Sequence, residues 1–124
     1  MAIDIYAKWK SQSSSIREAQ LNSVDDLNGG AVGYLREPYH GGPYATPRLV
    51  PEAFNNAEGA RIPAATLRQR LPEVLEIATW RERHLRHASK KHIKWIVGQF
   101  KDFVALCEKI EQQSGKPVTI HASW

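Results

Sequence analysis

The feature that most constrains the fold is an apolar stripe with helical spacing between residues 93 and 110. Apolar side chains recur there every three or four positions, and mostly polar residues fill the gaps. This spacing predicts an amphipathic α-helix that packs one face against a core. Ser89 offers an N-cap before the stripe, and Gly115 and Pro117 offer a C-terminal cap and a stop after it. The stripe consists of Ile93, Ile96, Val97, Phe100, Phe103, Val104, Cys107 and Ile110.

Two segments outside this helix alternate between apolar and polar residues with a period of two. Residues 2–9 place Ile3 and Ile5 on one face, and residues 118–124 repeat the pattern. Such alternation predicts half-buried β-strands. One strand therefore precedes the helical part of the chain and another follows it.

The segments between the first strand and the helical half carry weaker patterns. Residues 16–21 fit either a short turn of helix or a second strand, and residues 25–30 are rich in the turn formers Asp, Asn and Gly. Residues 31–36 and 60–62 read as further strands, and residues 49–54 as a short strand that enters a helical turn.

Two prolines punctuate the helical half of the chain. Pro63 suits the first turn of a helix over residues 63–70, and Pro72 either starts a new helix or kinks a continuous one. We therefore expect an α+β fold in which a small antiparallel or mixed sheet of three to five strands is covered on one face by two amphipathic helices. The 124 residues fit a single domain, with a strand and loop half at 1–62, a helical part at 63–113 and a final strand at 118–124.

Composition narrows the classes of function. The net charge of +4 favours anionic partners, either a nucleotide-like small molecule or an acidic macromolecule. Cys107 is the only cysteine, so the chain can form no internal disulfide, and its place on the apolar stripe predicts a buried, unreactive thiol. Because no leader pattern and no long apolar run occur, we expect a cytoplasmic protein with no membrane partner. Homo-oligomerisation stays open.

Residues 36–48 form the strongest candidate site. Three prolines and two glycines exclude a regular helix or central strand, and loops of this length often carry function. Glycines let backbone N–H groups approach an anion, arginines fork onto phosphate, and tyrosines and histidine offer ring faces and donors. The competing interpretation is a proline-stiffened connector whose tyrosines pack on the sheet. The candidate ligand-binding residues are Arg36, Tyr39, His40, Gly41, Gly42, Tyr44 and Arg48.

The leading functional hypothesis is therefore a small intracellular protein that binds a phosphate-bearing ligand such as a nucleotide. Such a protein would sequester a signalling nucleotide or inhibit a host factor. An alternative uses the basic helical corner between residues 81 and 94 against nucleic acid or an acidic protein. Trp80 and Trp95 flank this corner, where they fit either base stacking or the core register of their helices. The candidate nucleic-acid-binding residues are Arg83, Arg86, Lys90, Lys91 and Lys94.

A third hypothesis is a small hydrolase or transferase with His40 as its acid or base. No spacing of carboxylates around His40 requires this role, so we assign no catalytic residue and expect binding rather than catalysis. His84, His87 and His92 could hold a metal, but no carboxylate accompanies them and the surrounding cations oppose a divalent ion. We therefore expect no metal and no cofactor.

Three motifs in the first half of the chain resemble a group of small uncharacterised bacterial and phage proteins. The motifs are M-x-I-D-I-Y-x-x-W-K at the start, G-Y-L-R-E-x-Y-H-G-x-P-Y-A-T at residues 33–46, and L-V-P-E-A-F at residues 49–54. The resemblance covers residues 1–54 best. It implies a discrete intracellular protein, and it supplies no catalytic residues because no activity is established for the group.

Overall fold

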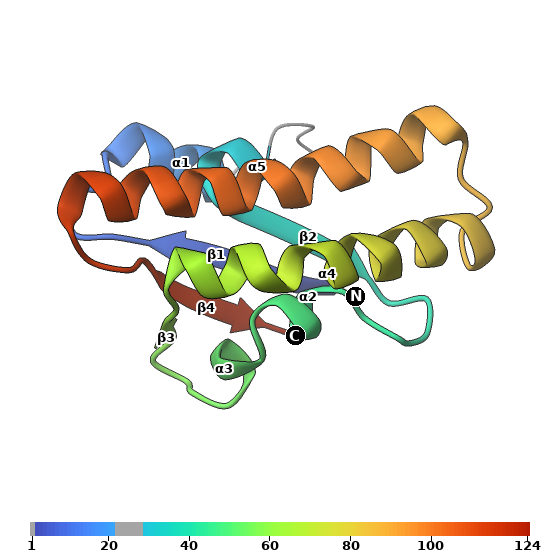
Figure 1. Cartoon of the computed structure of the whole chain (residues 1–124), viewed down its shortest axis with the longest axis horizontal. Helices are drawn as coiled ribbons and strands as arrows, with labels where there is room; N and C mark the ends of the chain where they lie inside the picture. The colour runs from blue at the N-terminus through green and yellow to red at the C-terminus, as the bar shows by residue number, and fades with distance from the viewer. Residues whose placement is uncertain (1, 22–28) are drawn as a thin grey trace.

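The computed structural model describes residues 2–21 and 29–124 and has the expected α+β architecture (Figure 1). Two long helices lie in front of a four-stranded sheet, and shorter helical segments lie around its edges. The elements are β1 (Ala2–Lys8), α1 (Ser14–Leu21), the 3₁₀-helix η2 (Gly29–Val32), β2 (Tyr34–Pro38), α2 (Thr46–Leu49), α3 (Pro51–Phe54), β3 (Ala60–Arg61), α4 (Ala64–His84), α5 (Lys90–Ser114) and β4 (Thr119–Ser123).

The sheet is antiparallel throughout, with strand order β2-β1-β4-β3. Ile5 of the central strand pairs with Leu35 on one side and with Ala122 on the other. Alternate residues of β1 are buried, as the period-two pattern predicts. The buried face of the sheet meets the two long helices, and this arrangement confirms the expected fold class.

The core lies between the sheet and the helices α4 and α5. Phe103 is its largest fully buried side chain. Cys107 is also buried, as its place on the stripe predicts. The stripe of α5 is buried from Phe100 onward, whereas Ile93, Ile96 and Val97 are only half-buried. The main contributors from the sheet and α4 are Ile3, Ile5, Ala7, Leu35, Val118, Ile120, Leu67, Leu71, Val74 and Ala78.

The two long helices begin and end largely where their capping residues predict. Ser89 caps α5 by accepting a hydrogen bond from the His92 backbone N–H at 3.1 Å, and Gly115 ends it with a φ of 74°. Helix α4 runs without interruption through Pro72, so of the two alternatives for Pro72 the continuous helix is the one that forms. A proline inside a helix costs about 3 kcal/mol. Burial of Leu71 and Val74 on either side of Pro72 offsets this cost and holds α4 together.

Residues 16–21 are helical, within α1, which decides between the two alternatives for this segment. Two other local expectations differ from the structure. Residues 29–32 form a 3₁₀-helix, so β2 begins at Tyr34 rather than at residue 31. The expected turn at residues 25–30 lies mostly outside the described residues. Residues 49 and 50 are not a strand, because helix α2 begins at Thr46 and ends at residue 49.

Long-range contacts decide both of these corrections. Gly30 lies so close to α5 that a Cβ atom there would overlap the backbone carbonyl of Gln99, and its N–H donates to Gln99 Oε1 at 2.8 Å. The start of α2 is capped by the carboxylate of Glu37, which accepts hydrogen bonds from the N–H groups of Ala45 and Thr46. Neither partner is visible in the local sequence pattern.

None of the helices in the described part of the chain combines the length and apolar character needed to span a membrane.

Candidate anion-binding site

The loop predicted as a ligand site is held by a buried ion pair between Glu37 and Arg81, which we call the Glu37–Arg81 clamp. The Glu37 carboxylate lies 3.1 Å from Arg81 Nε. It also accepts hydrogen bonds from Ala45 N at 2.7 Å, Thr46 N at 2.9 Å and Thr46 Oγ1 at 2.6 Å. Both charged side chains are less than a tenth exposed. Their hydrogen-bond donors and acceptors therefore bind groups inside the protein.

The guanidinium of Arg81 fastens the other side of the loop. It donates to the carbonyl oxygens of Pro38 at 2.8 Å and Pro43 at 2.9 Å, and also to that of Gly41. Its Cζ lies 4.5 Å from the centre of the Tyr44 ring. These contacts hold the loop against α4, as the connector interpretation expects of a fixed loop. Ligand binding by residues 36–48 stays a prediction.

The structure distributes the seven predicted loop residues over three surroundings. Arg36 lies on the sheet face that the helices leave open, 3.5 Å from Asp4, and Arg48 is on the helical side, 2.5 Å from Glu73. Tyr39 and Tyr44 meet edge to face, with ring centres 6.0 Å apart. The two tyrosines are thus brought together, and the two arginines are not. The remaining three, all exposed, are His40, Gly41 and Gly42.

The predicted basic corner lies at the connection between α4 and α5, at the right of Figure 1. Arg86 pairs with Glu82 at 3.1 Å, and His92 Nε2 lies 3.4 Å from the other oxygen of the same buried carboxylate. Trp80 is 42% exposed, so of the two alternatives the core register does not hold for it. The exposed basic residues of the corner are Arg83, His84, Arg86, His87, Lys90, Lys91 and Lys94.

A concave region at the opposite end of the sheet gathers unpaired cations. We call it the cationic hollow, and its volume is about 540 Å³. It is built where β1 ends, where β4 begins and where the edge strand β3 pairs with β4, so that Lys8 and Arg61 both lie opposite Thr119. The end of α5 closes it. Its lining residues are Lys8, Trp9, Lys10, Ser11, Arg61, Ser114, Lys116, Pro117 and Thr119.

The charges of the cationic hollow have one sign. Lys8, Lys10, Arg61 and Lys116 line it without any carboxylate, and within residues 2–21 and 29–124 none of the four forms an ion pair. Six other arginines do form ion pairs with carboxylates. Those pairs are Arg36–Asp4, Arg48–Glu73, Arg68–Glu108, Arg70–Glu52, Arg81–Glu37 and Arg86–Glu82.

The pKa of Lys8 shows the effect of this surrounding. Its ammonium donates to the side-chain oxygen of the fully buried Gln20 at 2.7 Å, which fixes its position without neutralising it. Partial burial lowers the pKa of Lys8 below its ordinary value, and the nearby positive charge of Arg17 lowers it further. An anion close to this ammonium would favour its charged form and so oppose the lowering of the pKa.

Sequence reasoning missed both the clamp and the hollow. Arg81 follows Leu71, Val74 and Ala78 at helical spacing, so its burial could have been found from the stripe of α4. The hollow offers only the local signal of Trp9 between two lysines. Its other cations are more than fifty residues away in the sequence, and tertiary structure alone brings them to Lys8.

Groups suited to catalysis are scarce among the described residues. Burial raises the pKa of the Cys107 thiol to about 12, which keeps it protonated and unreactive. His40 is exposed and has no ionic or hydrogen-bonded partner in the part of the chain that the structure describes. Within the same residues, no three His, Cys, Asp or Glu side chains are grouped closely enough to hold a metal ion.

Comparison of the chain with protein-family models, with curated proteins and with solved structures found no match. The resemblance to the bacterial and phage group therefore stays a prediction from the quoted motifs.

Proposed function

We propose that this protein binds a phosphate-bearing ligand, with a nucleotide as the leading class, in the cationic hollow. The observation that carries the proposal is the convergence of four cations from distant parts of the sequence on one concave surface without a carboxylate among its lining residues. Ordinary folded surfaces intersperse charges of both signs. A cluster of one sign is a cost to the folded protein unless a bound anion offsets it.

The side chains in the hollow suit the parts of a nucleotide. Arg61 offers a planar fork for two phosphate oxygens, and the lysines offer mobile point charges. Trp9 is half-buried, packs against the core and contributes to the lining of the hollow, where its indole offers a flat apolar surface to a base. A charged hydrogen bond of this kind contributes about 1.5–3 kcal/mol. Three such contacts support binding between about millimolar and micromolar dissociation constants.

The proposal keeps the phosphate-bearing ligand that the sequence suggested and moves its site from the loop to the far end of the sheet. Sequestration of the ligand, rather than its chemical conversion, is the activity that we propose. A single buried cysteine and a nucleotide ligand both fit the cytoplasm, so we propose that compartment.

Isothermal titration calorimetry with inorganic phosphate, pyrophosphate, AMP and ADP tests the proposal. We expect ADP or pyrophosphate to bind the parent, and Lys116→Ala or Arg61→Ala to weaken that binding about tenfold or more. Lys101→Ala is the matched control, because it removes one exposed lysine from α5 outside the hollow. If none of the four compounds binds, or if the control weakens binding as much as Lys116→Ala, the proposal is wrong.

A further inference from the structure

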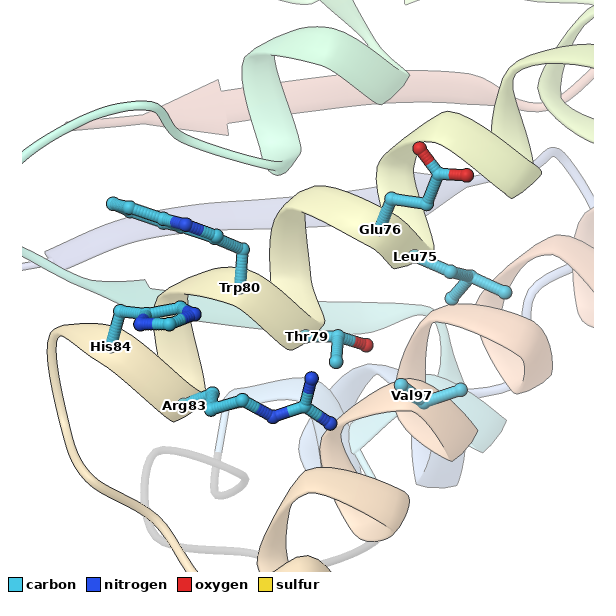
Figure 2. Close-up of a pocket in the computed structure, with 7 residues that line it drawn as sticks. All are labelled: Leu75, Glu76, Thr79, Trp80, Arg83, His84 and Val97. Carbon is cyan, nitrogen blue, oxygen red and sulfur yellow. The ribbon is translucent and has the colours of Figure 1, made fainter.

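A second concave surface lies between the far ends of α4 and α5, which extend past the strands at the right of Figure 1. This tip groove has a volume of about 420 Å³ and does not overlap the cationic hollow. Figure 2 shows Leu75 and Arg83 of α4 directed toward Val97 of α5, while Trp80 and His84 lie together on the outer side of α4. The ring centres of Trp80 and His84 are 5.2 Å apart.

The tip groove is an apolar surface that the fold leaves partly uncovered. The stripe of α5 continues beyond the last core contact of the sheet, and Ile96 and Val97 remain half-buried there. Trp80, one of the few exposed large apolar side chains, lines the groove from the outer side of α4. Uncovered apolar surface with polar residues around it marks interaction sites.

The rim of the tip groove is basic. Arg83 and His84 line it from α4. Lys94 and Lys101 are exposed, and they stand three residues before and four residues after Val97, which places them on the same side of α5. Glu76 is the one carboxylate that lines the groove among the described residues. The rim therefore complements a negatively charged partner.

We infer that the tip groove binds an amphipathic helix of a protein partner that carries acidic residues beside its apolar face. The lining from Leu75 to His84 spans about 13 Å of helix, which accommodates two to three turns of a bound helix. Its apolar side chains at positions i, i+3 or i+4, and i+7 would lie between Trp80 and Val97. Its acidic residues would face Arg83 and Lys94.

The lining of the tip groove disfavours two other occupants, a second copy of the chain and nucleic acid. A second copy joined through the same surface would bring two basic rims together, which like-charge repulsion opposes. Nucleic acid complements the rim, but it has no aliphatic side chains to fill a groove floored by Leu75 and Val97. Glu76 also sets an orientation, because the acidic end of a bound helix would avoid it and lie toward His84.

The test uses the full-length protein and a fluorescein-labelled synthetic helix of about 16 residues, with leucines at helical spacing and glutamates on the flanks. A peptide of the same composition in scrambled order is its control. Fluorescence anisotropy should show binding of the patterned peptide only. Trp80→Ala and Lys94→Glu should each weaken that binding about tenfold. Lys109→Glu is the matched control for Lys94→Glu, since it reverses an exposed lysine of α5 away from the groove.

Four outcomes would overturn the inference. The patterned peptide binds no better than the scrambled one, or Lys109→Glu weakens binding as much as Lys94→Glu. Alternatively, single-stranded oligo(dT) displaces the peptide and is itself released by Lys94→Glu, which would make the tip a nucleic-acid surface. Finally, sedimentation shows a dimer of the parent that Trp80→Ala dissociates, which would make a second copy the occupant. A failure of the phosphate-binding proposal leaves this result unaffected, because the two sites share no residue.

Discussion

The two ends of the sheet differ in whether their positive charges are neutralised by carboxylates. At one end, the Glu37–Arg81 clamp buries a guanidinium whose ionic and hydrogen-bonded partners all come from the protein. At the other end, the cationic hollow holds four cations without an ion pair among the described residues. The first arrangement neutralises its charge inside the protein, and we propose that an anion neutralises the second. The Arg, Tyr and Gly residues of the loop thus lie beside a clamp that is already neutral, while the unpaired cations of the hollow form the site that we propose.

The largest effect should follow from removal of one half of the clamp. Arg81→Met leaves the Glu37 carboxylate buried without its cation and removes donors to the loop carbonyls, so we expect a loss of about 3–5 kcal/mol of unfolding free energy. Chemical denaturation measures it. The double variant Glu37→Gln/Arg81→Met should recover part of the loss, because no uncompensated charge remains. A single variant as stable as the parent would contradict the description of the clamp.

A substitution in the cationic hollow should weaken ligand binding and should not lower the stability of the protein. Lys10→Ala should weaken binding of pyrophosphate or ADP by about 1.5–3 kcal/mol, or roughly ten- to a hundredfold. Without ligand, its melting temperature should equal or exceed that of the parent, because it relieves repulsion in the cationic hollow. Calorimetry and a thermal melt of the same sample test both halves. A clear drop in the melting temperature would show that the cation serves the fold, as Arg81 does.

The pH dependence of phosphate binding should follow the protonation state of Lys8. Its pKa is lowered in the folded protein by burial and by Arg17, so it loses its proton at a lower pH than an ordinary lysine. A bound phosphate favours the protonated form. Affinity should therefore be highest while Lys8 is charged and fall as pH rises through this lowered pKa. Lys8→Arg should remove that fall, since an arginine stays charged. Parallel alkaline profiles of the two proteins would exclude Lys8 from the site.

The smallest effect should come from Arg48, which the sequence favoured as a ligand contact. Its ion pair with Glu73 is exposed on both sides, so Arg48→Ala should leave the free energy of unfolding nearly unchanged. It should also leave phosphate binding unchanged within error. If Arg48→Ala weakens binding as strongly as Lys10→Ala, residues 36–48 are part of the ligand site and the contrast between the two ends is wrong.

Local periodicity predicted the fold better than it predicted the sites. Helix α5, its cap at Ser89 and the strands β1 and β4 follow from spacing within a few residues. The start of α2 did not follow, because the carboxylate that caps it lies eight or nine residues earlier in another element. The sequence pattern also gave no means of telling the basic residues of the corner apart. Arg81 and Arg86 are occupied by carboxylates, and only the contacts distinguish them from the exposed Arg83.

The sequence by itself determined the amphipathic helices, the half-buried strands, the buried thiol and the net positive charge. Each of these depends on side chains within a few positions of one another or on a sum over the chain. Tertiary structure alone decided which charges are neutralised. Coulomb interactions act through space over a few ångströms, so the partner of a cation is set by how the sheet and helices bring distant residues together. Arg81 meets a carboxylate forty-four positions away, whereas Lys8 meets further cations.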